Sequence, residues 1–240
     1  MVQGCPYGSH RSQEPRNSLP QTAWKLDTAL PICDNELLID VETLNVNSAS
    51  FAQMLSEVGP QPRMIADKVL NITRMRGKLH NPVTGSGGML LGRVKQIGKK
   101  HPASGIFNIN DKIATMVSLT LTPLWIDKIH NVNISSGQID VSGYAILFES
   151  GLYSKVPHDI PPRVLLLAYD EAGSVMQAYN LAARGDNVAI VGAEEKIGAL
   201  SLCAVRQKLG FSGKIFAIVR TGQSAGAIRK LGVADEVIVA

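Results

Sequence analysis

The stretch NVAIVGAEEKIGALSLCAVRQKLG, residues 187–210, holds two glycines at a spacing that could bind a diphosphate. An apolar run leads into Gly192, and Gly198 opens a segment with the apolar spacing of a helix. In a dinucleotide-binding turn, the first glycine makes the tight turn and the last lets helix and strand pack closely. The helix N-terminus supplies N–H groups and partial positive charge. The pattern predicts cofactor contacts at five positions: Gly192, Ala193, Lys196, Ile197 and Gly198.

The middle of this turn departs from the pattern, because Glu194 and Glu195 stand where a glycine normally lets the backbone approach the diphosphate. One carboxylate about 6 Å from one diphosphate charge costs about 3 kcal/mol at an effective dielectric constant of about 20, before salt screening. Side chains turned to solvent would reduce this cost, and Lys196 would offset part of it. We therefore expect nucleotide binding that is weakened but not abolished.

The end of the next strand bears on the choice of cofactor. An acid there usually accepts hydrogen bonds from the adenosine ribose, whereas this sequence has Arg220 followed by Thr221. An arginine at this position can accommodate a 2′-phosphate, which favours NADP. Arg220 could equally be an exposed arginine at a strand end, so the cofactor is predicted as NAD or NADP, with Arg220 and Thr221 among its contacts.

The elements that position this turn alternate between helix and strand. The order predicts an α/β region with a parallel sheet built from βαβ units. Three strands are half of a complete doubly wound sheet. The last strand would be an apolar edge that invites pairing with another chain, so we expect either a fragment or a homo-oligomer. The predicted elements are helix 164–183, buried strand 187–192, helix 196–210, strand 213–220, helix 224–232 and strand 235–240.

The residues up to about 160 show a different pattern, that of short strands separated by turns. After an extended arm, ELLIDVETLNV (36–46) alternates apolar and polar residues, which predicts a half-buried strand. Short strands separated by turn residues predict a small β-barrel or sandwich up to about residue 160. PHDIPPR (157–163) then marks a boundary, giving domains 1–162 and 163–240. The remaining predicted elements are helices 49–59 and 62–78 and strands 85–98, 108–124, 144–151 and 152–156.

Composition narrows the class of protein. Of 240 residues, 45% are apolar and 18% charged, which is typical of an ordinary globular protein. The net charge of +4 is scattered, so we expect no nucleic-acid partner. No apolar run reaches the roughly 20 residues that span a bilayer, and the polar N-terminus does not read as a signal peptide. Three separated cysteines indicate a reducing cytoplasm, with Cys203 expected in the core.

The order of a barrel before a dinucleotide-binding unit resembles the medium-chain dehydrogenase/reductase superfamily. NELLIDVETLNVNSASF and VTGSGGMLLGRVKQIG are similar to its GroES-like domain, and GKIFAIVR and LGVADEVIV to its Rossmann domain. GCPYGSHRSQEPRNSLPQTAWKLD, NPVTGSGGMLLG and AILFESGLYSKVP resemble the L-erythro-3,5-diaminohexanoate dehydrogenase family. The resemblance implies a GroES-like β-barrel followed by a half Rossmann domain. It also implies NAD(P)-dependent oxidative deamination of a diamino acid in lysine fermentation. Family members are longer, so we expect part of both domains to be missing.

The resemblance also directs attention to particular side chains. Zinc-dependent members of the superfamily carry ligands where this sequence reads NVNSASF and VTGSGGM, and neither stretch offers His, Cys or a carboxylate. We therefore predict no metal. Glu149 and Asp170 are candidate catalytic acids, with Glu171 beside them. Arg11, Ser86 and Glu149 are candidate contacts to the amino-acid substrate. Each could instead be a solvated or structural residue.

Two other functions remain open on the sequence alone. One is a zinc-free reductase of quinones or enoyl groups. The other is an inactive relative that serves as a subunit or binding module, which the charged turn and the half sheet would suit. A shared fold does not decide among them, since one fold supports many chemistries.

Overall fold

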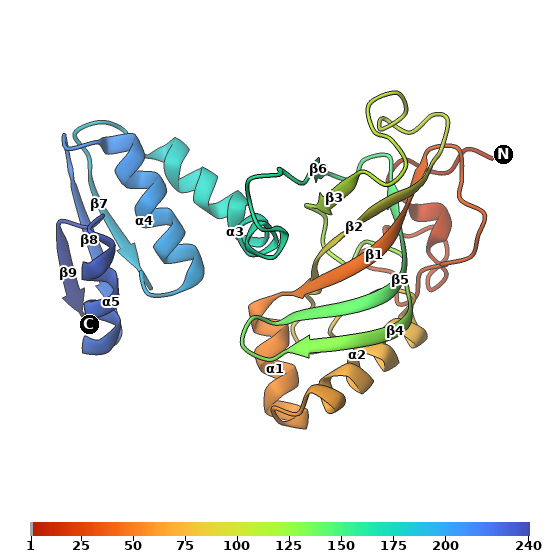
Figure 1. The fold of residues 1–240 in the computed structure, drawn as a ribbon, viewed down its shortest axis with the longest axis horizontal. Helices are drawn as coiled ribbons and strands as arrows, with labels where there is room; N and C mark the ends of the chain where they lie inside the picture. Colours follow the sequence, from red (N-terminus) through yellow and green to blue (C-terminus); the bar gives the residue numbers. More distant parts are fainter. Residues whose placement is uncertain (1) are drawn as a thin grey trace. The chain divides into compact units, whose positions relative to one another are not determined.

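The computed structural model describes residues 2–240, except for the side chains of residues 171 and 172, and it forms two compact units (Figure 1). Unit 1 comprises residues 1–170 and unit 2 residues 171–240. The division falls within helix α3 (Pro162–Leu181). Within the described residues, no helix is long and apolar enough to cross a membrane.

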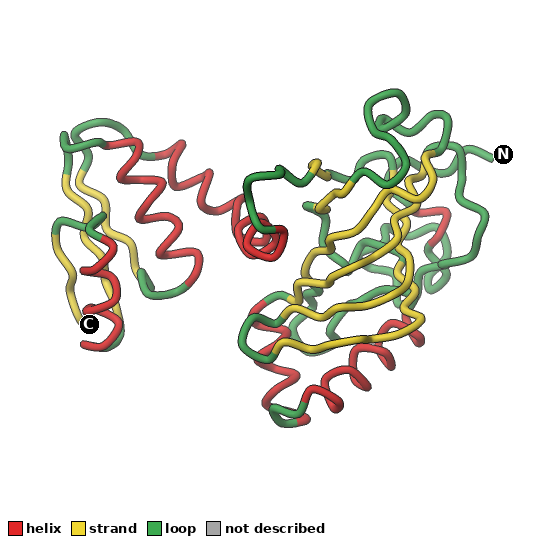
Figure 2. The backbone as a smooth tube through the Cα atoms, viewed as in Figure 1, coloured by secondary structure: helices red, strands yellow, loops and turns green. Residues whose placement is uncertain are grey.

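Unit 1 is built on one antiparallel sheet with the strand order β4-β5-β1-β2-β3-β6. Strands are yellow in Figure 2. β1 is central, with its first residue, Glu36, opposite Phe148 of β5 and its last, Val46, opposite Gly88 of β2. The strands are β1 (Glu36–Val46), β2 (Gly88–Ile97), β3 (Lys112–Thr115), β4 (Leu124–Asn133), β5 (Gln138–Phe148) and β6 (Tyr153–Lys155).

Two helices, α1 (Ser48–Val58) and α2 (Pro62–Arg76), pack their apolar residues into the main core of unit 1. The side chain of Asn47 caps α1 by accepting a hydrogen bond from the amide of Ala49. α2 begins at a proline, which suits the first turn of a helix, and ends at Gly77 in the left-handed conformation. These local signals explain why the sequence predicted both helices.

The prediction that β1 is half-buried holds only in the middle of the strand. Asp40 is exposed there, but both ends of the strand are buried on both faces. At the first end, Leu38 packs against Ile32 of the N-terminal arm. At the last end, Asn45 is covered by α3. The alternation of residue types in β1 could not reveal these two coverings, because both come from segments distant in the sequence.

Residues 108–124 were predicted as one strand entered from an Asn-Asp turn, but only Lys112–Thr115 form a strand, and the prediction is wrong beyond Thr115. The amide of Leu121 instead donates to the carbonyl of Ser118, and the hydroxyl of Thr120 donates to Gln21 of the arm, so the segment turns. β4, which follows, was missed. It is an edge strand with two register shifts against β5, and polar residues interrupt the alternation of its strand-favouring residues Trp125, Ile126, Ile129 and Val132.

Unit 2 contains a parallel sheet in the order β7-β8-β9, as the alternation of elements predicted. The prediction that β7 is a buried strand is wrong, because its residues alternate in burial and Val191 is 79% exposed. Cys203 is also exposed, contrary to expectation. The elements are β7 (Asn187–Val191), α4 (Lys196–Leu209), β8 (Lys214–Val219), α5 (Gly222–Leu231) and β9 (Glu236–Val239).

Candidate active site

Three hydroxyl side chains meet at the Val46 end of β1, where the sequence lacks the expected metal ligands. The Oγ of Ser50, in the first turn of α1, lies 2.5 Å from the Oγ of Ser86 and 2.6 Å from the Oγ1 of Thr84. Ser50 is fully buried, whereas Thr84 and Ser86 are partly accessible. The fold thus brings NVNSASF and VTGSGGM together. We call Ser50, Thr84 and Ser86 the hydroxyl cluster.

A glycine makes this approach of two segments possible. Gly88 has a φ of +124°, and a Cβ at this position would collide with the carbonyl oxygen of Asn45. The TGSGG loop can therefore lie against the end of β1 only with glycine here. This places the predicted substrate residue Ser86 within 3.5 Å of the amide oxygen of Asn47, the cap of α1.

Asp170 lies at the same end of β1. Its Oδ2 accepts a hydrogen bond of 3.1 Å from the side-chain Nδ2 of Asn45, a buried residue. Gln138, also buried, donates to the Oδ1 of Asn45 at 3.3 Å and to the carbonyl of Arg163 at 2.9 Å. Buried amides of this kind hold α3 on the sheet and fix the position of the Asp170 carboxylate. The side chain of Glu171 lies outside the described residues.

Glu149 lies at the opposite end of β1. It follows Phe148, the residue opposite Glu36, and accepts a 2.8 Å hydrogen bond from the buried Asn35. Glu36 and Asn45 are nine residues apart, which is about 30 Å at about 3.3 Å per residue. The structure therefore places the two predicted catalytic acids at opposite ends of β1, and their catalytic roles stay predictions.

Arg11 is also at the Glu36 end, and its guanidinium is engaged by the protein. Its Nε and Nη2 donate to the two carboxylate oxygens of Glu36 at 2.6 and 2.7 Å, and Nη1 donates to the carbonyls of Asp27 and Ala29. Arg11 is 4% exposed and Glu36 is 1% exposed. The predicted role of Arg11 in binding a substrate carboxylate stays a prediction, and it would require these bonds to break.

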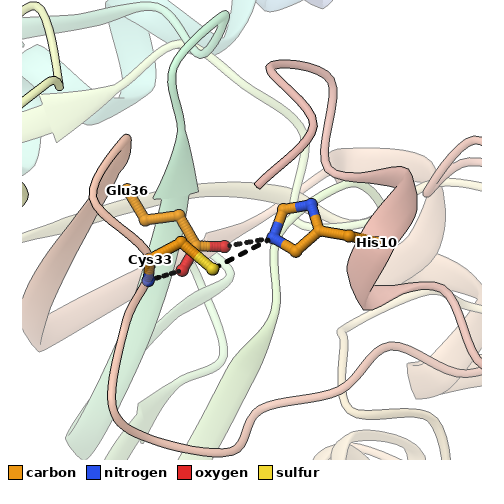
Figure 3. Close-up of side chains that lie close together, drawn as sticks. All are labelled: His10, Cys33 and Glu36. Carbon is orange, nitrogen blue, oxygen red and sulfur yellow. Dashed lines mark hydrogen bonds and ion pairs between the residues drawn. The ribbon is translucent and has the colours of Figure 1, made fainter. Parts of the chain in front are cut away.

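Burial raises the pKa of Glu36, but hydrogen bonds from Arg11, His10 and the amide of Cys33 outweigh this effect and lower it to about 2. His10, Cys33 and Glu36 form a group of possible metal ligands within the described part of the chain (Figure 3). The Nε2 of His10 lies 2.9 Å from Glu36 and 3.7 Å from the sulfur of Cys33. Sequence analysis missed this group, because the positions show no recognisable ligand spacing.

The hydrogen bonds of this group do not suit a cation. The amide of Cys5 donates to the Nδ1 of His10 at 2.9 Å, so the proton of a neutral ring is on Nε2 and points to Glu36. A metal at Nε2 would need that nitrogen deprotonated, and both Glu36 oxygens already accept from Arg11. The group anchors the arm to β1. The predicted absence of a metal stays a prediction.

In unit 2, the turn between β7 and α4 has the backbone of a close-packed βα connection. Gly192 has a φ of +73°, and a Cβ on Gly198 would collide with the carbonyl oxygen of Gly192. The two end glycines thus fill the structural roles that the sequence predicted. The amides of Gly192 and Ala193 both donate to the carbonyl of Ile218, at 3.0 and 3.1 Å, so they are already used within the sheet.

The remaining predicted cofactor residues surround the N-terminus of α4 and the end of β8. Lys196 and Ile197 open α4, whose N-cap Glu195 makes no side-chain capping bond. Thr221 caps α5 by accepting from the amide of Ser224 at 3.1 Å. Arg220 pairs with both acids of the turn, Glu194 and Glu195. Arg220 therefore partly neutralises the two acidic side chains of the turn. The spacing of these residues along the chain did not indicate this pairing.

An antiparallel sheet unit followed by a parallel βαβαβ unit defines the fold class of the chain, an antiparallel β domain joined to an α/β domain. The structure is similar to alcohol dehydrogenase from Thermotoga maritima, with a TM-score of 0.53 and 13% identity. The match covers 89% of this chain and 58% of that one. At this identity the similarity shows the fold alone.

The sequence comparisons narrow this class. Residues 10–157 match the model of the L-erythro-3,5-diaminohexanoate dehydrogenase N-terminal domain. The L-erythro-3,5-diaminohexanoate dehydrogenases of Acetoanaerobium sticklandii and Fusobacterium nucleatum are 44% and 40% identical to this chain. Each match covers 100% of this chain and 70% of the relative. The chain belongs to the L-erythro-3,5-diaminohexanoate dehydrogenase family, which confirms the resemblance seen in its sequence.

Proposed function

We propose that the protein catalyses the NAD(P)-dependent oxidative deamination of L-erythro-3,5-diaminohexanoate to 5-amino-3-oxohexanoate. The observation that carries this proposal is the match of the whole chain to two dehydrogenases of that name. A nicotinamide nucleotide, when bound, takes the hydride from the carbon that bears the β-amino group. The amino nitrogen loses a proton, water adds to the resulting imine of the substrate, and ammonium leaves to give the ketone.

The two units have separate tasks in this proposal. The antiparallel unit, residues 1–170, is a GroES-like substrate domain and the parallel unit, residues 171–240, a half Rossmann domain. The three parallel strands with their two crossover helices support the second assignment.

Within unit 1, the Val46 end of β1 suits the diamino acid better than the Glu149 end. Asp170 offers a carboxylate, which forms strong charge-assisted hydrogen bonds to ammonium groups and can accept the amine proton. Ser86, with the rest of the hydroxyl cluster, offers hydrogen-bond donors and acceptors for the other polar groups of the substrate.

The Glu149 end contains a cavity of about 370 Å³, lined mainly by apolar side chains that include Tyr7, Met116, Phe148 and Leu152. A substrate with two ammonium groups would lose hydration in such a cavity without finding partners. We therefore assign the substrate contacts to Ser86 and Asp170. Glu149 and Arg11 become residues that hold the arm in place.

The residues of unit 2 fit a dinucleotide at three points. At Gly198, helix and turn pack so closely that a Cβ would collide with the backbone, which is why the last position of such a turn needs glycine. The first turn of α4 provides N–H groups that have no acceptor within the helix. The Oε2 of Glu194 is buried without a hydrogen-bond partner among the described residues. Lys196, Ile197 and Gly198 would hold the diphosphate, and Arg220 and Thr221 lie at the ribose end.

The test combines binding with turnover. Purified protein is titrated with NADH and NADPH by nicotinamide fluorescence, and then mixed with the diamino acid and the oxidised nucleotide. We expect binding of a nucleotide, and reduced nicotinamide and ammonium in equal amounts. Reduction of a quinone or an enoyl compound, without ammonium release from the diamino acid, would favour the reductase alternative. A folded protein that binds neither nucleotide would favour the inactive relative.

Two further features belong to the proposal. We expect a homo-oligomer, and light scattering of the purified protein tests this. We also place the protein in the cytoplasm, because Cys5, Cys33 and Cys203 are free thiols.

A further inference from the structure

The hydroxyl cluster at the Val46 end of β1 is a closed triangle of hydrogen bonds. The Oγ of Ser50 lies 2.6 Å from the Oγ1 of Thr84 and 2.5 Å from the Oγ of Ser86. The third side of the triangle, between Thr84 and Ser86, is 3.1 Å long. Ser86 also lies 3.5 Å from the Oδ1 of Asn47, which is an acceptor.

A count of hydrogens shows what this triangle can offer a ligand. Each hydroxyl group has one hydrogen to donate and two lone pairs that accept. The three sides of the triangle and the contact with Asn47 need every hydrogen of the three hydroxyl groups, whereas lone pairs remain. Ser50 is fully buried, so the accessible lone pairs are those of Thr84 and Ser86. The cluster therefore presents acceptors to a ligand and no donors.

Such a surface distinguishes between the polar groups of the diamino acid. An ammonium group only donates hydrogen bonds, and a carboxylate only accepts them. An ammonium group can bind with the triangle intact, whereas a carboxylate would have to break one of its bonds. Among the described residues, no arginine or lysine hydrogen-bonds to the cluster to balance a carboxylate. The N-terminus of α1, which attracts anions, is already capped by Asn47.

The second group that suits an ammonium lies close by. Asp170 accepts a hydrogen bond from Asn45, and Asn47 contacts the cluster. Asn45 and Asn47 are two residues apart, which is about 7 Å at about 3.3 Å per residue. Three carbon atoms join the carbons' two nitrogens in the diamino acid, so one molecule can reach both places. If Asp170 takes the proton of the amine that is oxidised, the cluster faces the other amine.

Resting on the proposed function, we infer that Thr84 and Ser86 bind the 5-ammonium group of the diamino acid and make the site selective for diamino over monoamino acids. Like the amine of lysine, this group is protonated at neutral pH. It takes no part in the chemistry, so its contact is the same in the bound substrate and in the transition state. A contact of this kind lowers KM and leaves kcat unchanged.

The experiment compares two substrates in the presence of NAD or NADP, with reduced nicotinamide as the readout. One is 3,5-diaminohexanoate, and the other is 3-aminohexanoate, the same acid without the 5-amino group. We expect the unchanged protein to have a KM for the diamino acid that is lower by about tenfold or more, the worth of a hydrogen bond to a charged group.

Two variants each remove one accessible hydroxyl group. In Ser86→Ala, and in Thr84→Val, which keeps the shape of the side chain, the KM for the diamino acid should rise about tenfold. The KM for 3-aminohexanoate and both kcat values should stay the same. Ser142→Ala is the matched control, because Ser142 is an exposed serine of β5 that bonds to His130. It should leave both KM values unchanged. Circular dichroism and the melting temperature show that each variant is folded.

The outcomes separate this inference from the function on which it rests. If the unchanged protein uses 3-aminohexanoate as well as the diamino acid, the inference is wrong while oxidative deamination stands. The same holds if the folded variants change KM equally for both substrates, as loss of a carboxylate contact would, or change neither. If the unchanged protein releases no ammonium from the diamino acid, the proposed function fails, and this inference fails with it.

Discussion

Replacing Glu36 by glutamine removes the charge that balances the buried Arg11 guanidinium. The two side chains are 1% and 4% exposed and are joined by hydrogen bonds of 2.6 and 2.7 Å. Glutamine has nearly the same shape, so the main change is an uncompensated buried charge. Breaking a buried pair in this way costs about 3–5 kcal/mol. We therefore expect Glu36→Gln to lower the free energy of unfolding of unit 1 by this amount at neutral pH.

The pKa of Glu36 gives a second value for how much the Glu36–Arg11 pair contributes to the stability of unit 1. Burial raises this pKa, but hydrogen bonds from Arg11 and other donors bring it to about 2, against an ordinary value of 4.5. The difference corresponds to about 3 kcal/mol of stability, at about 1.4 kcal/mol per pH unit. Because the pKa is lowered in the folded protein, this stability is fully present above pH 4.5 and is lost as the pH falls towards 2. The two routes agree.

The assay is urea unfolding followed by tryptophan fluorescence at pH 7 and at pH 3. Both tryptophans, Trp24 and Trp125, belong to unit 1 and report its unfolding. Glu42→Gln is the matched control, because Glu42 makes partly exposed pairs with Arg93 and Lys112, each worth at most about 1 kcal/mol. If Glu36→Gln is no less stable than Glu42→Gln, or loses as much stability between pH 7 and pH 3 as the unchanged protein, Glu36 does not hold Arg11, and Arg11 returns to the candidate substrate contacts.

Three further predictions test the site and the fold. Gly198→Ala should weaken NADH binding at least about tenfold, because the added Cβ displaces α4 from the turn. The control Gly226→Ala should bind NADH normally, because a Cβ there meets no atom within 4 Å. Asp170→Asn should lower kcat/KM for the diamino acid about 10–100-fold, the worth of a charged hydrogen bond, without changing NADH affinity. Burial lowers the pKa of Lys78 to about 8, so unit 1 should gain about 3 kcal/mol as the pH rises from 8 to 10.5. Lys78→Met should abolish this rise in urea titrations.

The sequence predicted those elements whose signals are local. α1 and α2 carry their own caps, and the alternation of β7, α4 and β8 follows from apolar periodicity. β4 was missed, because a polar edge strand lacks the apolar pattern that marks a central one. The exposure of β7 was also missed, because whether an apolar strand is covered depends on segments that its own residues do not describe.

The arrangement of the candidate residues could not be predicted for a related reason. Whether Asp170 and Glu149 share a site depends on which end of β1 each one reaches. That is set by the register of β1 with β5 and by the packing of α3, through contacts between residues more than 90 apart in the sequence. Spacing along the chain identified residues able to do the chemistry, but only the register separated them into two groups.

The two places where the sequence departs from the superfamily pattern share one physical feature. Where metal ligands would stand, Ser50, Thr84 and Ser86 satisfy one another by hydrogen bonds. Where a glycine would stand, Glu194 is held by Arg220, which lowers the pKa of its carboxyl and keeps it charged at neutral pH. An unpaired acid in the turn would repel a diphosphate, whereas an acid turned to the strand end and paired there leaves the helix N-terminus accessible. The acidic turn is therefore compatible with a bound dinucleotide.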